Sequence, residues 1–103
     1  MPNMFEQAKK AMELRSQMKK ITKELSEMRI DYENAGVKIV IHGDLVIESV
    51  EFTDPSVIDP AHPEKLQRTI KENVNKAINK AKQDSEARMK EVTRGMDLGG
   101  LLG

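Results

Sequence analysis

The hydrophobic positions in the first third of the chain follow a heptad repeat. Apolar side chains recur at Met4, Ala11, Met18 and Leu25, and three places later at Leu14, Ile21 and Met28. This spacing predicts one long helix over residues 4–32, which Gly36 would end in the left-handed conformation that closes many helices. At 1.5 Å per residue the helix would be about 43 Å long, whereas a compact chain of about 100 residues has a radius of gyration of about 13 Å. We therefore expect it to project from the body or to lie along a partner.

The middle of the chain predicts a β-hairpin over residues 37–53. An apolar, mostly β-branched run at 37–41 is followed by a reversal, in which Gly43 is free to take a positive φ, and by a returning run at 45–52. The alternation changes phase near Glu48, which a β-bulge or a break into two short strands would explain. By the same alternation, Val40 and Val46 lie on the face opposite Ile39, Ile41, Leu45 and Ile47. That face needs its own cover, so we expect one of these valines to lie in a homodimer interface.

The last third predicts a second helix over residues 63–94. Its apolar stripe runs at helical spacing through Leu66, Ile70, Val74, Ala77, Ile78, Ala81, Ser85, Met89 and Val92. Residues 95–103 predict a mobile tail. The expected architecture is a single α+β domain over residues 1–103. It would have a long N-terminal helix, a two- or three-stranded antiparallel β-sheet and a long C-terminal helix.

Charge is unevenly distributed along a chain whose net charge is zero, with 17 basic and 17 acidic residues. Residues 9–23 and residues 65–82 each hold six basic side chains against one acidic side chain, whereas residues 32–63 hold one against six. Dense positive charge on a helix suits contact with phosphates. The cations that fall away from the two apolar stripes are predicted to bind DNA: Lys9, Lys19, Lys20, Lys23, Lys65, Arg68, Lys76 and Lys80.

Composition excludes several other functions. Cysteine is absent, which removes disulfides and thiolate chemistry, and aromatic residues make up only 3% of the chain, too few for a base-stacking platform. No nucleophile is paired with a base, and His42 and His62 stand too far apart in the sequence to suggest a metal site. No apolar run is long enough to span a bilayer. We expect a cytoplasmic protein without enzyme activity, metal, cofactor, small-molecule substrate or membrane partner.

Several local strings, in this order, carry a resemblance. A basic helix precedes the hairpin sequence Ala35–Gly43, and a Pro-marked turn at 50–56 precedes a helix containing Asn-Lys-Ala at 75–77. The chain then continues through Gly-Met-Asp-Leu at 95–98. Together these features resemble the YbaB/EbfC family of nucleoid-associated DNA-binding proteins over nearly the whole chain. The resemblance implies an α-β-β-β-α protomer and a homodimer with protruding helical arms. It also implies binding to double-stranded DNA in the nucleoid with little sequence preference, with effects on nucleoid organisation and gene expression.

Two other interpretations of the same pattern stay open at this stage. The basic faces would be merely solvated in an assembly or adaptor domain. A helical-hairpin chaperone similar to the beta subunit of prefoldin also places β-hairpin sequence between two helices, and it would hold unfolded clients with apolar helix tips. Concentrated positive charge favours DNA over both.

Overall fold

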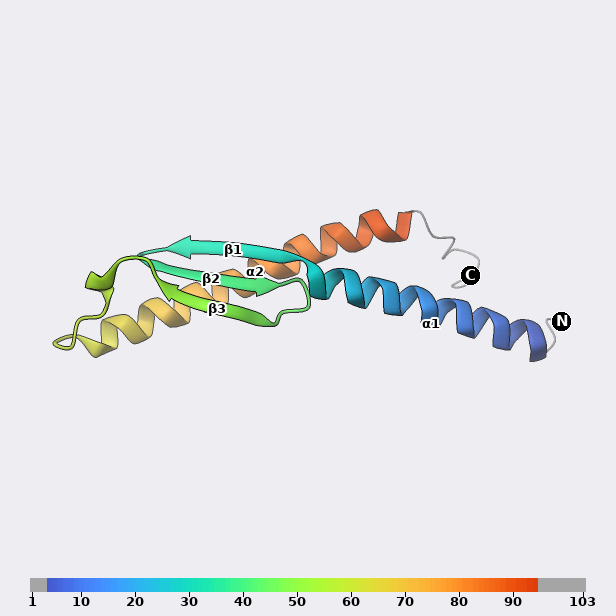
Figure 1. The fold of residues 1–103 in the computed structure, drawn as a ribbon, viewed down its shortest axis with the longest axis horizontal. Coiled ribbons are helices and arrows are strands. Elements are labelled where there is room, and N and C mark those ends of the chain that lie inside the picture. The colour runs from blue at the N-terminus through green and yellow to red at the C-terminus, as the bar shows by residue number, and fades with distance from the viewer. Residues whose placement is uncertain (1–3, 95–103) are drawn as a thin grey trace.

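The computed structural model describes residues 4–94 and has the predicted α-β-β-β-α order. Its elements are α1 (Met4–Glu27), β1 (Arg29–Asn34), β2 (Val37–His42), β3 (Ile47–Phe52), the short 3-10 helix η1 (Pro55–Val57) and α2 (Pro63–Arg94). The strands form one antiparallel sheet in the order β1-β2-β3, and α1 extends from one end of it (Figure 1). The molecule measures 71 × 20 × 19 Å. The predicted α+β class, the bounds of the second helix and the projecting first helix are confirmed.

The first helix is shorter than predicted, because its expected last turn is a strand. α1 ends at Glu27, where the amide of Met28 donates to the carbonyls of Glu24 and Leu25. From Arg29 onward the chain pairs with β2 along its whole length, from Arg29 opposite His42 to Asn34 opposite Val37. Ile30 is buried against α2 while its neighbours on either side are exposed. This alternation is typical of a strand, and it overrides the helical spacing.

Gly36 has the predicted positive φ but a different role. Ala35 and Gly36, with φ of 54° and 80°, form the tight turn between β1 and β2 and do not end a helix. Right-handed strand twist favours turns of this kind. The Asn73 amide of α2 donates to the carbonyl of Asn34 at 2.9 Å, and the Thr53 amide donates to that of Gly36 at 2.8 Å. These bonds fix the turn against its surroundings.

The predicted bulge in the returning strand is confirmed. Val40 pairs with Ser49 and Ile41 pairs with Ile47, so Glu48 is the extra residue. Gly43, in the reversal before β3, does not have the positive φ expected of it; Leu45 does, at 69°. Gly43 is needed for close approach instead, because a Cβ there would lie 2.8 Å from the carbonyl oxygen of Leu25.

The core lies between α2 and the sheet. α2 packs on β1 and β2, with Ala77 and Ala81 against Val37, Ile39 and Ile41, all of them fully buried. Small residues on α2 allow the helix to approach the sheet closely. Because α2 covers β1 and β2, the edge strand β3 keeps apolar side chains exposed on the same face of the sheet. These are Ile47, Val50 and Phe52.

Replacing Gly36 by Ala should destabilise the fold. The new Cβ would lie 2.7 Å from Val57 Cγ1 and 2.9 Å from Asp54 Cβ, at a backbone φ that side chains rarely adopt. We expect a loss of about 1–3 kcal/mol, equivalent to a Tm lower by roughly 5–15 °C, in thermal unfolding followed by circular dichroism. Ala35→Gly is the matched control, because glycine relieves strain at the neighbouring positive φ. A parent-like Tm for Gly36→Ala would contradict the strain argument.

Candidate nucleic-acid interface

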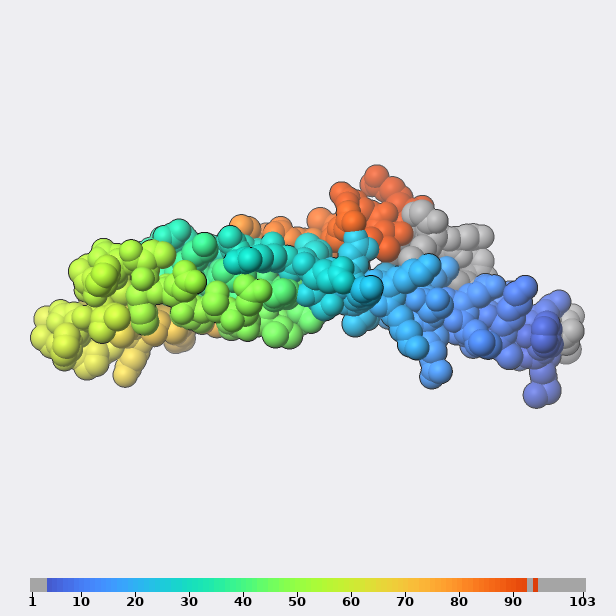
Figure 2. Space-filling model, in the orientation of Figure 1, coloured from blue at the N-terminus to red at the C-terminus, as the bar shows by residue number. Residues whose placement is uncertain are grey.

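The first part of α1 is a free arm. Every residue from Met4 to Ser16 is exposed, and the first buried side chain of the helix is Ile21. The arm continues the long axis of the molecule beyond the sheet (Figures 1 and 2). A helix exposed on all sides can present charge to a partner without opening any contact within its own chain.

The four lysines predicted on this helix are all exposed. Lys9, Lys19, Lys20 and Lys23 form no ion pair with any residue that the structure describes. Their ammonium groups are thus available as donors to phosphate oxygens. Sequence reasoning left out Lys10 and Arg15, which are equally exposed and equally free of ion pairs with described residues. It selected the lysines that share one arc of the helix, but the arm is exposed on every side from Met4 to Ser16.

The four cations predicted on the second helix lie elsewhere. Lys65, Arg68 and Lys76 are exposed on α2, and the Lys80 ammonium donates to the backbone carbonyl of Asp31 at 2.9 Å. α2 begins at the end of the molecule far from α1 and reaches α1 only with its last turns (Figure 1). The structure therefore does not bring the two predicted sets together within one chain. The α1 set forms one surface, which we call the arm surface: Lys9, Lys19, Lys20 and Lys23.

The arm is joined to the body through a short contact region that we call the junction: residues 24–27 of α1 with Met28 after it, His42 and Gly43 of the hairpin, and Ser85 and Arg88 of α2. The amide of Gly43 donates to the carbonyl of Met28 at 3.1 Å, and the Ser85 hydroxyl donates to the carbonyl of Gly43 at 2.6 Å. Arg88 forms ion pairs with Glu24 of α1 and with Glu91. These two carboxylates raise the pKa of the guanidinium and occupy its donors, so Arg88 belongs to the junction and not to a phosphate site.

The two valines predicted at a dimer interface differ in exposure. Val40 is 2% exposed within a single chain, on the outer face of the sheet, where Asp31 and Ser49 are its cross-strand partners. Val46 is 57% exposed in the turn before β3. Of the two, Val46 is therefore the one that a second subunit could reach directly.

The titratable groups of residues 4–94 do not assemble a metal centre. Within this part of the chain no three His, Asp or Glu side chains gather as metal ligands. His62 hydrogen-bonds Asp59 at 3.0 Å, which lowers the pKa of that carboxyl, and both lie in the exposed loop before α2. His42 lies at the junction, between α1 and Glu48. None of the helices described is both long and apolar enough to cross a membrane.

Comparison with known proteins agrees with this arrangement. The model of the YbaB/EbfC DNA-binding family matches residues 1–96. A nucleoid-associated protein of Akkermansia muciniphila is 30% identical over 97 residues, covering 93% of each chain. One from Clostridium acetobutylicum is 31% identical over 93 residues, covering 82% of this chain and 83% of the relative. Another, from Alkaliphilus metalliredigens, is 30% identical over 103 residues, covering 98% and 90%. This chain therefore belongs to the YbaB/EbfC DNA-binding family.

Proposed function

We propose that this protein binds double-stranded DNA with little sequence preference, as a homodimer whose α1 arms contact the phosphates. The observation that carries the proposal is the arm surface, with four exposed lysines that have no ion-pair partner among the described residues. Lysines so placed replace condensed counterions on the phosphates, and the released ions supply the driving force. Because phosphates are present at every base pair, such contacts position a protein without reading sequence.

Duplex DNA suits this surface better than single strands do. The chain has one Tyr, two Phe and no Trp. Binding of single strands relies on stacking bases against aromatic rings. Phe5 is the one aromatic residue on α1, so the arm has no pair of rings on which successive bases could stack. Electrostatic contact with a duplex backbone needs no rings.

The homodimer is supported by the uncovered edge of the sheet. Ile47, Val50 and Phe52 of β3 lie on the face that α2 covers over β1 and β2. We call these three residues the β3 apolar strip; Val46 lies just before it. Removing such apolar surface from water contributes about 25 cal/mol per Å², which favours association. A second copy that packs its own strip here would cover both strips and place two arms on one assembly.

The nucleoid is the proposed location of this activity. The relatives from Akkermansia, Clostridium and Alkaliphilus carry the name nucleoid-associated protein. A dimer with two arms would contact both phosphate backbones of one duplex, or two separate duplexes. In either way it would affect nucleoid organisation and gene expression. We propose no enzyme activity, metal or cofactor for this role, because phosphate contact needs none of them.

One observation favours the chaperone alternative. Met4, Phe5 and Met12 are apolar and exposed near the tip of the arm, and apolar tips are what a client-holding helical hairpin requires. The same arm carries the free lysines, however, which a client-holding surface does not need. Suppression of the aggregation of an unfolded client by this protein, combined with no binding to duplex DNA, would favour the chaperone.

The salt dependence of binding tests the proposal. With about 5 phosphates engaged, a plot of log K against log salt should have a slope of about −4 to −5. Fluorescence anisotropy with two labelled duplexes of unrelated sequence gives the slope and the sequence preference together. We expect nearly equal affinities for the two duplexes and weaker binding to a single strand of the same length. A flat salt response, or a preference for the single strand, would contradict the proposal.

A further inference from the structure

The angle of the α1 arm depends on few contacts. Beyond the burial of Ile21, the polar contacts that hold the end of α1 are few: the Gly43 amide donates to Met28 just after the helix, His42 contacts Ser26, and Arg88 of α2 pairs with Glu24. Gly43 approaches so closely that even a Cβ would meet the carbonyl of Leu25. A change in one of these contacts would alter the restraint on an arm that is otherwise exposed.

His42 occupies a position between two acceptors. Its Nδ1 lies 2.6 Å from the carbonyl oxygen of Ser26 at the end of α1, and its Nε2 lies 3.2 Å from Glu48 Oε1. Neither a carbonyl nor a carboxylate can donate a hydrogen bond. A neutral imidazole has one N–H and satisfies one acceptor, whereas an imidazolium satisfies both. The geometry therefore suits the protonated ring.

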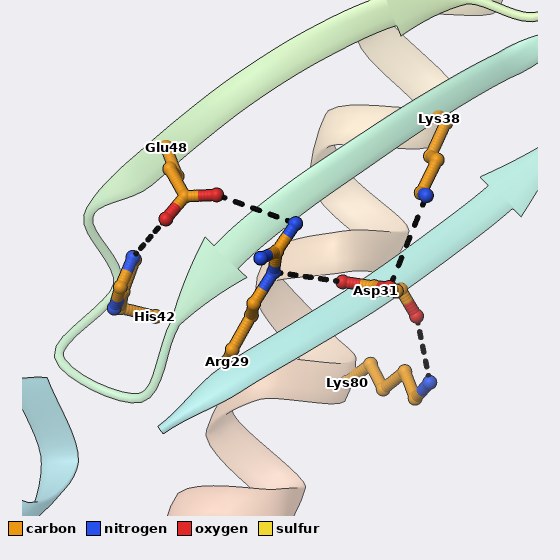
Figure 3. A network of polar contacts seen from close by, with 6 residues as sticks. All are labelled: Arg29, Asp31, Lys38, His42, Glu48 and Lys80. Atoms are coloured by element: carbon orange, nitrogen blue, oxygen red, sulfur yellow. Dashed lines mark hydrogen bonds and ion pairs between the residues drawn. The ribbon is translucent and has the colours of Figure 1, made fainter. Parts of the chain in front are cut away.

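The β-bulge places Glu48 in this position. Because Glu48 is the extra residue opposite Val40 and Ile41, it is free of the strand pairing and turns to the outer face of the sheet. There its Oε1 contacts His42 while its Oε2 lies 3.6 Å from the guanidinium of Arg29, the cross-strand partner of His42 (Figure 3). One carboxylate thus bridges the hairpin, β1 and, through His42, the end of α1.

The other charged groups near the His42 ring do not, on balance, oppose its protonation. Asp44, in the same turn, favours the imidazolium. The positive charge of Arg29 opposes it, but Arg29 is itself shared with Asp31 at 3.6 Å, and Asp31 also lies 4.0 Å from the ammonium of Lys38 (Figure 3). From α1 the ring meets a backbone carbonyl; on α2, the junction groups are the Ser85 hydroxyl, which donates to Gly43, and Arg88, which is paired with Glu24. The surroundings therefore support a positive ring.

We propose that His42 is a positioning residue, whose protonation fixes the α1 arm to the sheet and whose deprotonation loosens it. The imidazolium donates to α1 and to Glu48 at once, so it connects the helix to the bulged strand. The neutral ring keeps only one of these bonds and turns a lone pair to the other acceptor. The arm would then have a wider range of angles. The consequence for DNA rests on the function proposed above; the motion of the arm does not.

The direction of the pH dependence follows from the two hydrogen bonds. The Ser26 carbonyl, and then Glu48, raise the pKa of His42 above its usual value of 6.5. A raised pKa in the folded state means that the contribution is fully present below pH 6.5 and is lost as the pH rises through the raised value. The arm should therefore be most restrained in mildly acidic solution and least restrained in mildly alkaline solution.

Distances between two spin labels test the motion without DNA. The chain contains no cysteine, so Met12→Cys on the arm and Gln83→Cys on α2, both at exposed positions, give two unique attachment sites. Labelled chains diluted with unlabelled chains report distances within one protomer. We expect the distance distribution to be narrow at pH 6 and at least twice as wide at pH 8.5. His42→Gln, which offers no imidazolium, should be wide at both pH values.

His62→Gln is the matched control, because it removes the other histidine of the chain, which directly precedes α2. The start of α2 lies at the end of the molecule away from α1 (Figure 1). This variant should follow the parent at both pH values. A width that does not change with pH in the parent, or a change that survives in His42→Gln, would overturn the inference. NMR titration of the His42 ring in the parent supplies the midpoint, which should coincide with the midpoint of the change in width.

DNA binding at the two pH values separates this inference from the proposed function. If the arm responds to pH through His42 but no duplex binds, the inference stands and the proposed function fails. If duplex DNA binds and the arm does not respond, the proposed function stands and the inference fails. If both hold, the parent should bind duplex several-fold more tightly at pH 6 than at pH 8.5, and His42→Gln should lose most of that difference.

Discussion

Replacing Lys19, Lys20 and Lys23 together by Ala should weaken duplex binding by roughly 100-fold at an ionic strength of about 0.15 M. Each lysine–phosphate contact contributes a salt slope of about 0.9, equivalent to about 0.7 log units between 0.15 M and 1 M salt. Loss of three of the roughly five contacts therefore removes about 2 log units of affinity, and the salt slope should fall by about 3. Anisotropy titrations at several salt concentrations measure both quantities.

The fold should survive this change. The three lysines are exposed, and they form no ion pair with described residues. Alanine also has the highest helix propensity. Lys20→Ala and Lys38→Ala form the matched single pair: each removes one ammonium, but Lys38 lies on the sheet near Asp31, so its loss should have little effect. Parent-like binding by the triple variant would contradict the assignment of the arm surface, and its unfolding would show that these lysines are structural.

The second helix was predictable in full because one pattern dominates it. Its apolar positions keep helical spacing from Leu66 to Val92, and Pro63, which cannot donate a backbone N–H, marks its start. The hairpin was predictable for the same reason, including the bulge, because the alternation itself changes phase at Glu48. Where the local pattern and the tertiary packing favour the same element, the sequence is sufficient to predict that element.

β1 was not predictable because two patterns overlap at the end of α1. Met28 continues the heptad, while Ile30 and Tyr32 alternate with charged residues as in a strand. The hydrogen bonds offered by β2 and the packing of Ile30 in the core decide in favour of the strand. Neither is visible in a local window. The predicted mobile tail, residues 95–103, lies outside the described residues.

The predicted DNA-binding residues show a similar division. The charge distribution located the two basic stretches, and the helical spacing predicted which face of each helix their side chains occupy. They could not show that Lys80 donates to the carbonyl of Asp31, or that the first turns of α2, which carry Lys65 and Arg68, lie at the end away from the arm (Figure 1). Those facts depend on how α2 crosses the sheet. The assignment of the eight cations to DNA stays a prediction, and the triple variant tests its α1 part.

The choice between Val40 and Val46 also depended on tertiary structure. Alternation places Val40 on the outer face, and from the sequence that face needed an apolar cover. In the structure its cross-strand partners are the polar residues Asp31 and Ser49, and Val40 is already buried within one chain. Val40→Asp should therefore unfold the protomer. Val46→Asp, at an exposed position, should keep the fold and weaken only the proposed dimer.

Val50→Asp should weaken the proposed dimer by at least 100-fold. Val50 is 44% exposed in one chain, at the centre of the β3 apolar strip and opposite Ile39. In the monomer an aspartate at this position would be exposed to water. In the dimer it would be a buried, unpaired charge, which costs about 3 kcal/mol or more of association free energy. That energy corresponds to about two orders of magnitude in Kd. Sedimentation velocity over a concentration series measures the shift from dimer to monomer.

Thr53→Asp is the matched control for this prediction, because it adds the same charge at an exposed position just beyond β3. It should leave the assembly unchanged, whereas Val50→Asp should give a folded monomer with a parent-like helical spectrum. Since two arms share one DNA molecule only when the dimer forms, that monomer should also lose about half of the salt slope. A parent protein that sediments as a monomer at micromolar concentration would overturn the homodimer, and a Val50→Asp protein that stays dimeric would move the interface away from β3.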